Sequence, residues 1–229
     1  MRMEDTHDSG EEGELERKRR RRDEEQESVR LSQRLAITNE RATEWDWSNT
    51  EGIAYQIAGD SLCIVSWLRG VWSITQAQYS IRIAKMINIF SGMSEFYGVR
   101  PPCQGADLVR HEYRENNTIA DNLTHQAREG HQHKWIDVRF LQHPFSNVKC
   151  VGLRGAFDGG KDDSAVACGA WLEIAASMSG GAVRWIPVYR ECYLISCQAS
   201  VTEAELSAAE SLVEASLFVL ASIAECDSL

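Results

Sequence analysis

The segment from Val151 to Gly160 constrains the fold of this chain more than any other. Apolar residues alternate with small or polar ones from Val151 to Asp158, which is typical of a β-strand. Gly159 and Gly160 follow Asp158 and predict a sharp turn and a close approach of the backbone to a ligand. A carboxylate at the end of a buried strand is costly unless a partner or metal neutralises it. Taken alone, the segment is better explained by an ordinary turn aspartate, so its function depends on three other segments.

The first 44 residues have the composition of a disordered tail. They hold 10 Lys or Arg and 13 Asp or Glu and almost no large apolar side chains, so they cannot bury a core. The six consecutive basic residues Arg17 to Arg22 are compatible with nuclear import, with a nucleic-acid contact, or with a solvated low-complexity tail. We therefore predict a charged disordered tail over residues 1–44 and an ordered domain over residues 45–225.

Composition limits the classes of function. The 229 residues are 43% hydrophobic, which suffices for one good core. Beyond residue 44 there are 14 basic and 21 acidic residues, so this part carries a charge of −7 and cannot grip nucleic acid by charge alone. No apolar run approaches a membrane span, and we expect no membrane partner. The seven cysteines contain no Cys-x-x-Cys pair and predict reduced thiols in an intracellular protein, either cytoplasmic or nuclear.

The part of the chain between residues 45 and 130 predicts two strands and three helices. A strand around Ile53 to Ile57 stops at Gly59-Asp60-Ser61, so that a second aspartate lies at a strand end beside a glycine. Asn117 is expected to cap the last helix, with Asp121 one turn later on the same face. The remaining predicted elements of this half are helices over residues 62–68 and 79–90, a strand over 108–113 and the Asn117 helix to residue 129.

Residues 131–149 are polar and predict a linker, after which the opening strand is followed by strands over 165–176 and 183–197. Ser200 and Glu203 form a capping box for a helix that reaches about residue 224. Glu205 lies among small and apolar residues of this helix, whereas Glu203, Glu210 and Glu214 line a flank that looks solvated. The position of Glu205 requires a functional or structural reason.

Four carboxylates stand out because each is at a strand end or on a helix face: Asp60, Asp121, Asp158 and Glu205. Converging carboxylates repel one another unless divalent cations hold them, and hard oxygen ligands suit Mg²⁺ or Mn²⁺. Two such ions about 4 Å apart can activate water and stabilise the leaving oxygen in phosphodiester hydrolysis. From the residues alone the set is suggestive only, since an acidic chain offers many accidental quartets.

The local motifs resemble those of the ribonuclease H family in its reverse-transcriptase-like branch. Phe157-Asp158-Gly159-Gly160 resembles the first strand of that family, and Thr202-Glu203-Ala204-Glu205-Leu206 resembles its first helix. Gly59-Asp60-Ser61 with the following Trp67 to Trp72 resembles its fourth strand and next helix. The segment from His111 to Asp121 resembles its last strand and final helix, where the family keeps a histidine, an asparagine and an aspartate at these separations.

The order of these motifs differs from that of the family. The family runs from the Asp158-like strand through the Glu205-like helix to the Asp60-like strand and the Asp121-like helix. This chain begins at the third element and supplies the first two last, as in a circular permutation joined by residues 131–149. The alternative is a segment spanning the back half of one domain and the front half of its neighbour, in which half-domains pair within one chain or between chains.

The resemblance implies an α/β fold: a ribonuclease H-like mixed five-stranded sheet, circularly permuted, with helices on both faces. The strand over residues 151–158 would be central and flanked by the antiparallel hairpin strands. Residues 45–130 would form the back half of the family pattern and residues 150–225 the front half.

The resemblance also implies an endonuclease that cuts the RNA strand of RNA–DNA hybrids with two Mg²⁺ or Mn²⁺ ions. It assigns metal binding to Asp158, Glu205, Asp60 and Asp121, and a proton-shuttle position to His111. Substrate contacts would come from Gly159, Gly160, Ser61 and Asn117, where the 2′-hydroxyl distinguishes RNA from DNA.

Two alternatives belong to other functional classes. One is a catalytically inactive ribonuclease H-like module of mobile-element origin that binds partners or nucleic acid, which the acidic composition and the permuted order favour. The other is a plain α/β interaction domain with accidental carboxylates, if the motif matches arise by chance.

Overall fold

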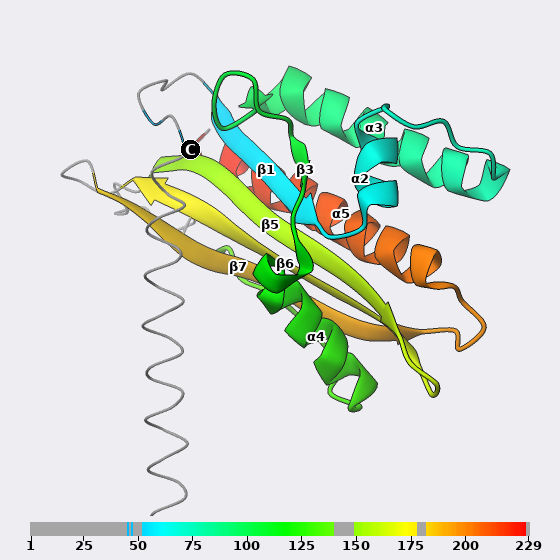
Figure 1. The fold of residues 1–229 in the computed structure, drawn as a ribbon. Coiled ribbons are helices and arrows are strands. Elements are labelled where there is room, and N and C mark those ends of the chain that lie inside the picture. The colour runs from blue at the N-terminus through cyan, green and yellow to red at the C-terminus, as the bar shows by residue number, and fades with distance from the viewer. Residues whose placement is uncertain (1–44, 46, 48–51, 140–148, 178–181, 228–229) are drawn as a thin grey trace, which may run out of the picture. The chain divides into compact units, whose positions relative to one another are not determined.

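A computed structural model describes residues 45, 47, 52–139, 149–177 and 182–227. The chain divides into two units, Met1–Trp45 and Asp46–Leu229, and nearly all of the first lies outside the described residues. The predictions for the charged tail and for Arg17 to Arg22 therefore stay untested. The second unit is an α/β structure in which helices pack on a mixed, open sheet (Figure 1).

The sheet of the second unit has seven strands within the described residues, two more than the sequence predicted. Their order is β2-β1-β5-β6-β7-β4, and β3 pairs with β1 outside this path. The strands are β1 (Ile53–Gly59), β2 (Val99–Arg100), β3 (Val109–His111), β4 (His133–Ile136), β5 (Lys149–Lys161), β6 (Val166–Ser177) and β7 (Val183–Ile195). The additional strands are short, so their local sequence carries little period-2 signal.

The strand that holds Asp158 is central, as predicted, but its neighbours differ from the prediction. β5 pairs in parallel with β1 on one side and antiparallel with β6 on the other. The hairpin strands β6 and β7 therefore lie on one side of β5 and do not flank it. The β1–β5 ladder runs from Ala54 opposite Gly152 to Gly59 opposite Phe157, so both halves of the chain share one sheet.

The segment predicted as a linker contains the edge strand β4. His133–Ile136 pairs antiparallel with β7, with Trp135 opposite Arg190. The prediction of a linker over 131–149 is wrong for these four residues, because backbone pairing with β7 stabilises a strand that is too polar and too short to recognise from its sequence. Residues 140–148 lie outside the described residues.

The helices cover both faces of the sheet, which confirms the predicted α/β class (Figure 1). A Cβ atom at Gly155 would lie 3.0 Å from Leu212 of α5 (Val201–Asp227), whereas one at Gly160 would lie 2.9 Å from Thr124 of α4 (Thr118–Arg128). Alternate residues of a strand point to opposite faces, so α5 and α4 lie on opposite sides of β5. The helices are α2 (Leu62–Leu68), α3 (Ala77–Tyr97), α4 (Thr118–Arg128) and α5 (Val201–Asp227), with the 3-10 helix η1 (Arg114–Asn116) before α4.

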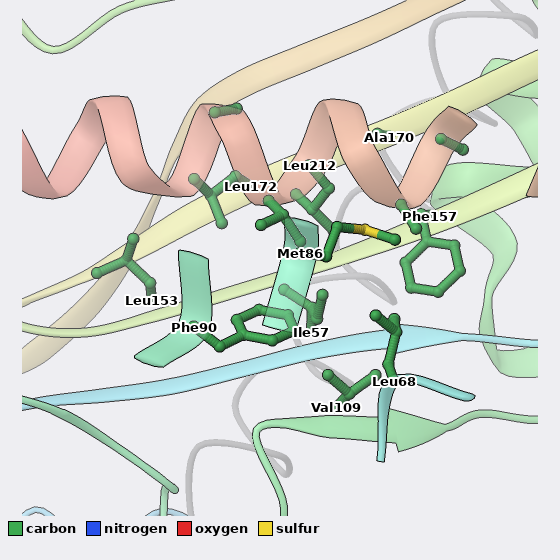
Figure 2. Packing of buried hydrophobic residues seen from close by; sticks show 14 of the residues in the cluster. Ile57, Leu68, Met86, Phe90, Val109, Leu153, Phe157, Ala170, Leu172 and Leu212 are labelled. Carbon is green, nitrogen blue, oxygen red and sulfur yellow. The ribbon is translucent and has the colours of Figure 1, made fainter. Parts of the chain in front are cut away.

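The main core lies between the sheet and the helices α2, α3 and α5 (Figure 2). Ile57 and Leu153, on neighbouring strands, are fully buried together with Met86 of α3 and Leu212 of α5. The ring of Tyr55 lies 6.1 Å from that of Phe90, and its hydroxyl donates to Ser216 of α5 at 3.1 Å. The core therefore fixes α3 and α5 against β5, which contains Asp158, and against β1, which Asp60 follows directly.

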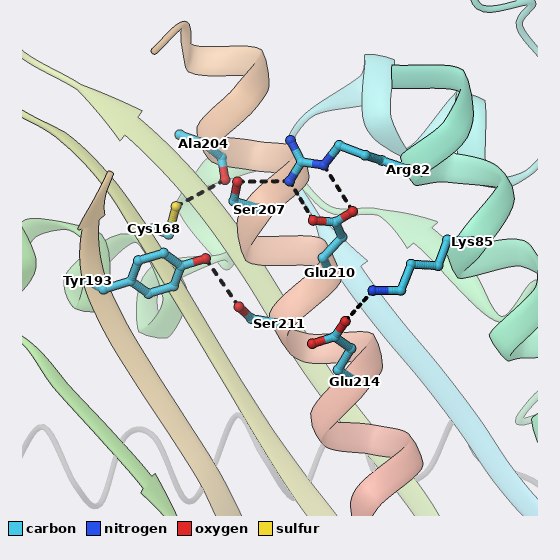
Figure 3. A network of polar contacts seen from close by, with 9 residues as sticks. All are labelled: Arg82, Lys85, Cys168, Tyr193, Ala204, Ser207, Glu210, Ser211 and Glu214. Carbon is cyan, nitrogen blue, oxygen red and sulfur yellow. Dashed lines mark hydrogen bonds and ion pairs between the residues drawn. The ribbon is translucent and has the colours of Figure 1, made fainter. Parts of the chain in front are cut away.

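Ion pairs join α3 to α5 and correct one prediction (Figure 3). Arg82 Nε donates to Glu210 Oε1 at 2.9 Å, and Lys85 Nζ donates to Glu214 Oε1 at 2.6 Å. Glu210 is therefore not simply solvated, as its sequence position suggested, but forms part of the helix interface. Glu203 closes the predicted capping box, in which its backbone N–H donates to Ser200 Oγ at 3.1 Å.

The helix α5 is long and apolar. By length and composition Val201–Glu225 reaches the range of a membrane span, contrary to the expectation that no apolar run approaches one. Its apolar residues Leu206, Leu212, Val213 and Leu220 are buried in the core that it forms with the sheet. The apolar composition of α5 is therefore explained by its burial as a core helix of this unit.

Candidate metal centre

The parallel pairing of β1 and β5 brings two aspartates to the same edge of the sheet. Gly59 is the last residue of β1 and lies opposite Phe157 of β5. The next residues along each chain are Asp60 and Asp158, so the parallel register places them side by side. Asp158 lies inside β5 and not at its end, because β5 continues to Lys161.

The two glycines after Asp158 do not form the predicted turn; both are paired residues of β5, opposite Cys168 and Ala167. A Cβ atom at Gly159 would overlap the backbone of Ala204 and Glu205, and one at Gly160 would lie 2.6 Å from Arg128 Nη1. The glycines therefore permit the close approach of two helices to the strand. The first turn of α5 can reach the strand beside Asp158 because residue 159 has no side chain.

The carboxylates of Asp60, Asp158 and Glu205 form one cluster, the acidic triad. One oxygen from each lies within 4.8 Å of the others. Asp158 is 2% exposed and Glu205 is 6% exposed. Asp60 Oδ1, Asp158 Oδ2 and Glu205 Oε2 are buried and have no hydrogen-bond partner within the described part of the chain. Buried polar atoms normally have partners, so three unpartnered oxygens at one point indicate a ligand that supplies positive charge.

Burial and mutual repulsion disfavour the charged forms of this triad. Desolvation raises the pKa of Asp158 from 3.8 to about 6, with further raising by the charges of Asp60 and Asp121 and opposition from a Thr124 hydrogen bond. Desolvation also raises the pKa of Glu205 well above its ordinary value, and the charges of Asp158 and Asp60 raise it further. Without a cation, Asp158 and Glu205 therefore hold their protons to a higher pH than ordinary carboxyl groups do.

Asp121 lies beside the triad but is not part of the set whose oxygens approach within 4.8 Å. It is in the first turn of α4, as predicted, and its charge reaches Asp158. Its Oδ1 accepts a hydrogen bond from Arg114 Nη2 at 3.1 Å. The structure thus brings together three of the four predicted ligands and pairs the fourth with an arginine.

His111 and Ser61 lie next to Asp60. His111 is the last residue of β3, and its Nε2 lies 3.1 Å from the backbone oxygen of Asp60. Ser61 is the N-cap residue of α2, but its side chain makes no capping hydrogen bond. Both residues are therefore beside the triad, and their roles in proton transfer and substrate binding stay predictions.

Asn117 connects α4 to the strand that carries Asp158. It is 3% exposed, and its Nδ2 donates to the Phe157 carbonyl oxygen at 2.9 Å. Asn117 occupies the predicted N-cap position, but its side chain makes no capping hydrogen bond, and its buried Oδ1 has no partner within the described residues. Gly159 and Gly160 are buried under α5 and α4, so whether their backbone reaches a substrate stays a prediction.

The residues of the triad fit a hard divalent cation. All three donors are carboxylate oxygens, the ligands that Mg²⁺ and Mn²⁺ prefer. A cation would neutralise the repulsion and partner the three orphaned oxygens. The triad could therefore bind a metal, while the donor chemistry alone does not separate Mg²⁺ from Mn²⁺.

Two residues at the site had no role in the sequence analysis. Arg114 precedes Asp121 by seven residues in the same motif, and a cation at that spacing from a predicted ligand was the available signal. Thr124 Oγ1 donates to Ala120 O at 3.0 Å and lies 3.3 Å from Asp158 O. No sequence pattern indicates this second contact, because it joins two segments far apart in the chain.

Comparison with known proteins adds no family assignment. No protein-family model, curated protein or solved structure matches this chain.

Proposed function

We propose that this protein is a ribonuclease H-like, metal-dependent endonuclease that hydrolyses the RNA strand of RNA–DNA hybrids. One observation carries the proposal: the carboxyl groups of Asp60 after β1, Asp158 in β5 and Glu205 in α5 converge, and each has a buried oxygen without a partner among the described residues. The family that the motifs resemble uses acidic residues at these motif positions. The mixed α/β sheet with helices on both faces is consistent with that fold.

The permuted order belongs to the same proposal. The strand of the Asp158 motif and the strand of the Asp60 motif are parallel neighbours in one sheet of one chain. This arrangement supports a single domain with permuted halves, because the two halves complete each other without a second chain. In this proposal residues 45–130 supply the back half of the family pattern and residues 150–225 supply the front half.

The chain's own residues would hold the metal and orient the substrate. Asp60, Asp158 and Glu205 would hold a divalent cation, and Asp121, whose charge acts on Asp158, would contribute to a second one. A bound pair of ions supplies activation of water and charge stabilisation at the leaving oxygen. His111, whose Nε2 lies 3.1 Å from the Asp60 backbone oxygen, would accept or donate a proton in the reaction.

A hybrid-cleavage assay tests the proposal. The full chain is incubated with an RNA–DNA hybrid labelled on the RNA strand, with Mg²⁺, with Mn²⁺ and with a chelator. We expect cleavage of the RNA strand only when metal is present, and no cleavage by Asp158→Asn. Double-stranded DNA and single-stranded RNA, assayed in parallel, define the specificity.

The alternative is an inactive module of the same fold, which the net charge of −7 beyond residue 44 favours because it opposes binding of a polyanion. Metal-dependent stabilisation without cleavage of any nucleic acid would support this alternative. Cleavage that survives Asp158→Asn would contradict the assignment of the site.

A further inference from the structure

The ion pair between Arg114 and Asp121 separates one predicted metal ligand from the other three. Arg114 is the first residue of η1, and Asp121 lies in the first turn of α4. Arg114 Nη2 lies 3.1 Å from Asp121 Oδ1, while the triad oxygens lie within 4.8 Å of one another without Asp121. The site thus consists of the acidic triad and of a fourth carboxylate, that of Asp121, which is already paired with the guanidinium of Arg114.

The two parts differ in exposure. The side chains of Arg114 and Asp121 are 69% and 40% exposed, whereas Asp158 and Glu205 are buried. Exposed ion pairs contribute little stability and exchange readily with other cations. The buried triad has unpartnered oxygens that a cation would satisfy. The first divalent cation is therefore expected at the triad, where no partner has to be displaced, whereas a cation that binds Asp121 has to displace Arg114.

The charge of Arg114 reaches the triad as well as Asp121. The neighbouring carboxylate of Asp121 raises the pKa of Arg114 most, and the charges of Asp158 and Asp60 add to this effect. Arg114 in turn opposes the rise in pKa of Asp158 and Glu205. By contact, however, Arg114 pairs with Asp121, at 3.1 Å, and it acts on the triad only through its charge.

We propose that Arg114 makes metal binding sequential: one divalent cation binds at Asp60, Asp158 and Glu205, and a second binds only when Asp121 exchanges Arg114 for it. The inference rests on the metal site of the proposed function and adds a competing residue within the chain. Arg114 acts here as a positioning residue, since it controls the availability of the Asp121 carboxylate.

Titration of the full chain with Mn²⁺ tests the inference without any activity assay. Free Mn²⁺ measured by electron paramagnetic resonance gives the number of ions bound, and calorimetry gives the affinity of each step. For the unmodified protein we expect a tight step followed by a weaker one. For Arg114→Ala we expect the weaker step to tighten by about three- to tenfold, because a competing cation is lost.

Three variants sharpen this measurement. Arg114→Lys keeps the charge but loses the planar fork, so its second step should lie between those of the unmodified protein and Arg114→Ala. Asp121→Asn should remove the second step, and adding Arg114→Ala to it should not restore that step. Lys85→Ala removes a cation from another exposed ion pair, with Glu214, nine residues beyond Glu205 on α5, and should leave both steps unchanged.

The outcomes separate this inference from the proposed function. Mn²⁺ binding that requires Asp158 but is unchanged or weakened by Arg114→Ala would overturn the role of Arg114 alone. Two equally tight sites in the unmodified protein would also overturn it. Absence of Mn²⁺ binding by the unmodified protein would overturn the metal site itself and with it the role of Arg114. A thermal melt of each variant without metal confirms that it folds.

Discussion

Asp158 shows how one buried carboxylate links stability to function. Its pKa is raised to about 6, so the folded protein holds a proton that the unfolded chain releases near pH 3.8. The free energy of unfolding contributed by this group is highest below pH 4 and falls as the pH rises toward 6. Above that range the charged carboxylate is a cost of about 3 kcal/mol that a metal would offset.

Asp158→Asn is therefore expected to leave metal-free stability equal or higher at pH 7, and to abolish the stabilisation by Mg²⁺. The amide removes the charge that burial disfavours and also removes a ligand. Thermal melts of both proteins at pH 4 and pH 7, with and without Mg²⁺, measure these effects. The stability difference between the proteins should be larger at pH 7 than at pH 4, and an equal Mg²⁺ shift in the variant would place the ion elsewhere.

Asn117→Ala is expected to destabilise the protein by about 1–3 kcal/mol, because it leaves the buried Phe157 carbonyl oxygen without its donor. The same change should weaken Mn²⁺ binding, since the bond fixes α4 and Asp121 against β5. Chemical denaturation and Mn²⁺ titration measure both effects. Asn88→Ala on the exposed face of α3 is the matched control and should change neither quantity. Unchanged stability in Asn117→Ala would mean that this bond contributes nothing to the interface.

At the scale of elements, the approach of α5 to β5 depends on a missing side chain. A Cβ atom at Gly159 would overlap the backbone of Glu205, and backbone cannot move aside as a flexible side chain can. The contact lies in the first turn of α5, next to the capping box of Ser200 and Glu203. Glycine thus serves helix packing here, and the same residue sets the position of a predicted metal ligand.

Gly159→Ala should therefore destabilise the protein by several kcal/mol and remove the Mg²⁺-dependent rise in melting temperature, although every carboxylate is retained. Gly92→Ala in α3 is the control, because an added Cβ there would lie no closer than 3.8 Å to Phe96. The control should be neutral or up to about 1 kcal/mol more stable, since alanine favours the helix. Equal melting behaviour of the two variants would show that α5 does not need this close approach.

At the scale of the whole molecule, two sequence halves form one sheet through the parallel ladder between β1 and β5. The chain between them, residues 140–148, lies outside the described residues. The core holds Tyr55 and Ile57 from the first half against Leu153 and Leu212 from the second. Neither half can bury its apolar face alone, so the halves depend on each other for folding.

Separately produced fragments 46–139 and 149–229 are therefore expected to be unfolded alone and to form a folded 1:1 complex when mixed. Circular dichroism and sedimentation measure the helical signal and the stoichiometry. The complex should regain the Mg²⁺-dependent stabilisation, because Asp60 comes from one fragment and Asp158 from the other. Ile57→Arg in the first fragment should prevent assembly, since Ile57 is fully buried. Fragments that fold independently would contradict a single shared domain.

The long elements of this protein were predictable from its sequence because their signals are local. The period-2 pattern before Asp158, the helix over Leu62–Leu68 and the capping box of Ser200 and Glu203 all appear where predicted. Glu205 was singled out because a glutamate among small and apolar neighbours implies burial, and it is buried. Periodicity and capping depend on residues within a few positions of one another, so one segment suffices to identify them.

Only the tertiary structure decided which residues from remote segments are neighbours in space. The register of Gly59 opposite Phe157 joins Asp60 to Asp158 across about a hundred residues of sequence. The edge strand β4 forms because β7 offers backbone partners, which no local pattern in His133–Ile136 records. The position of Asp121 outside the triad depends on how α4 packs on the sheet, whereas its pairing with Arg114, seven residues away, is local in sequence. Contacts between remote segments depend on how those segments pack, so the sequence of one segment alone does not predict them.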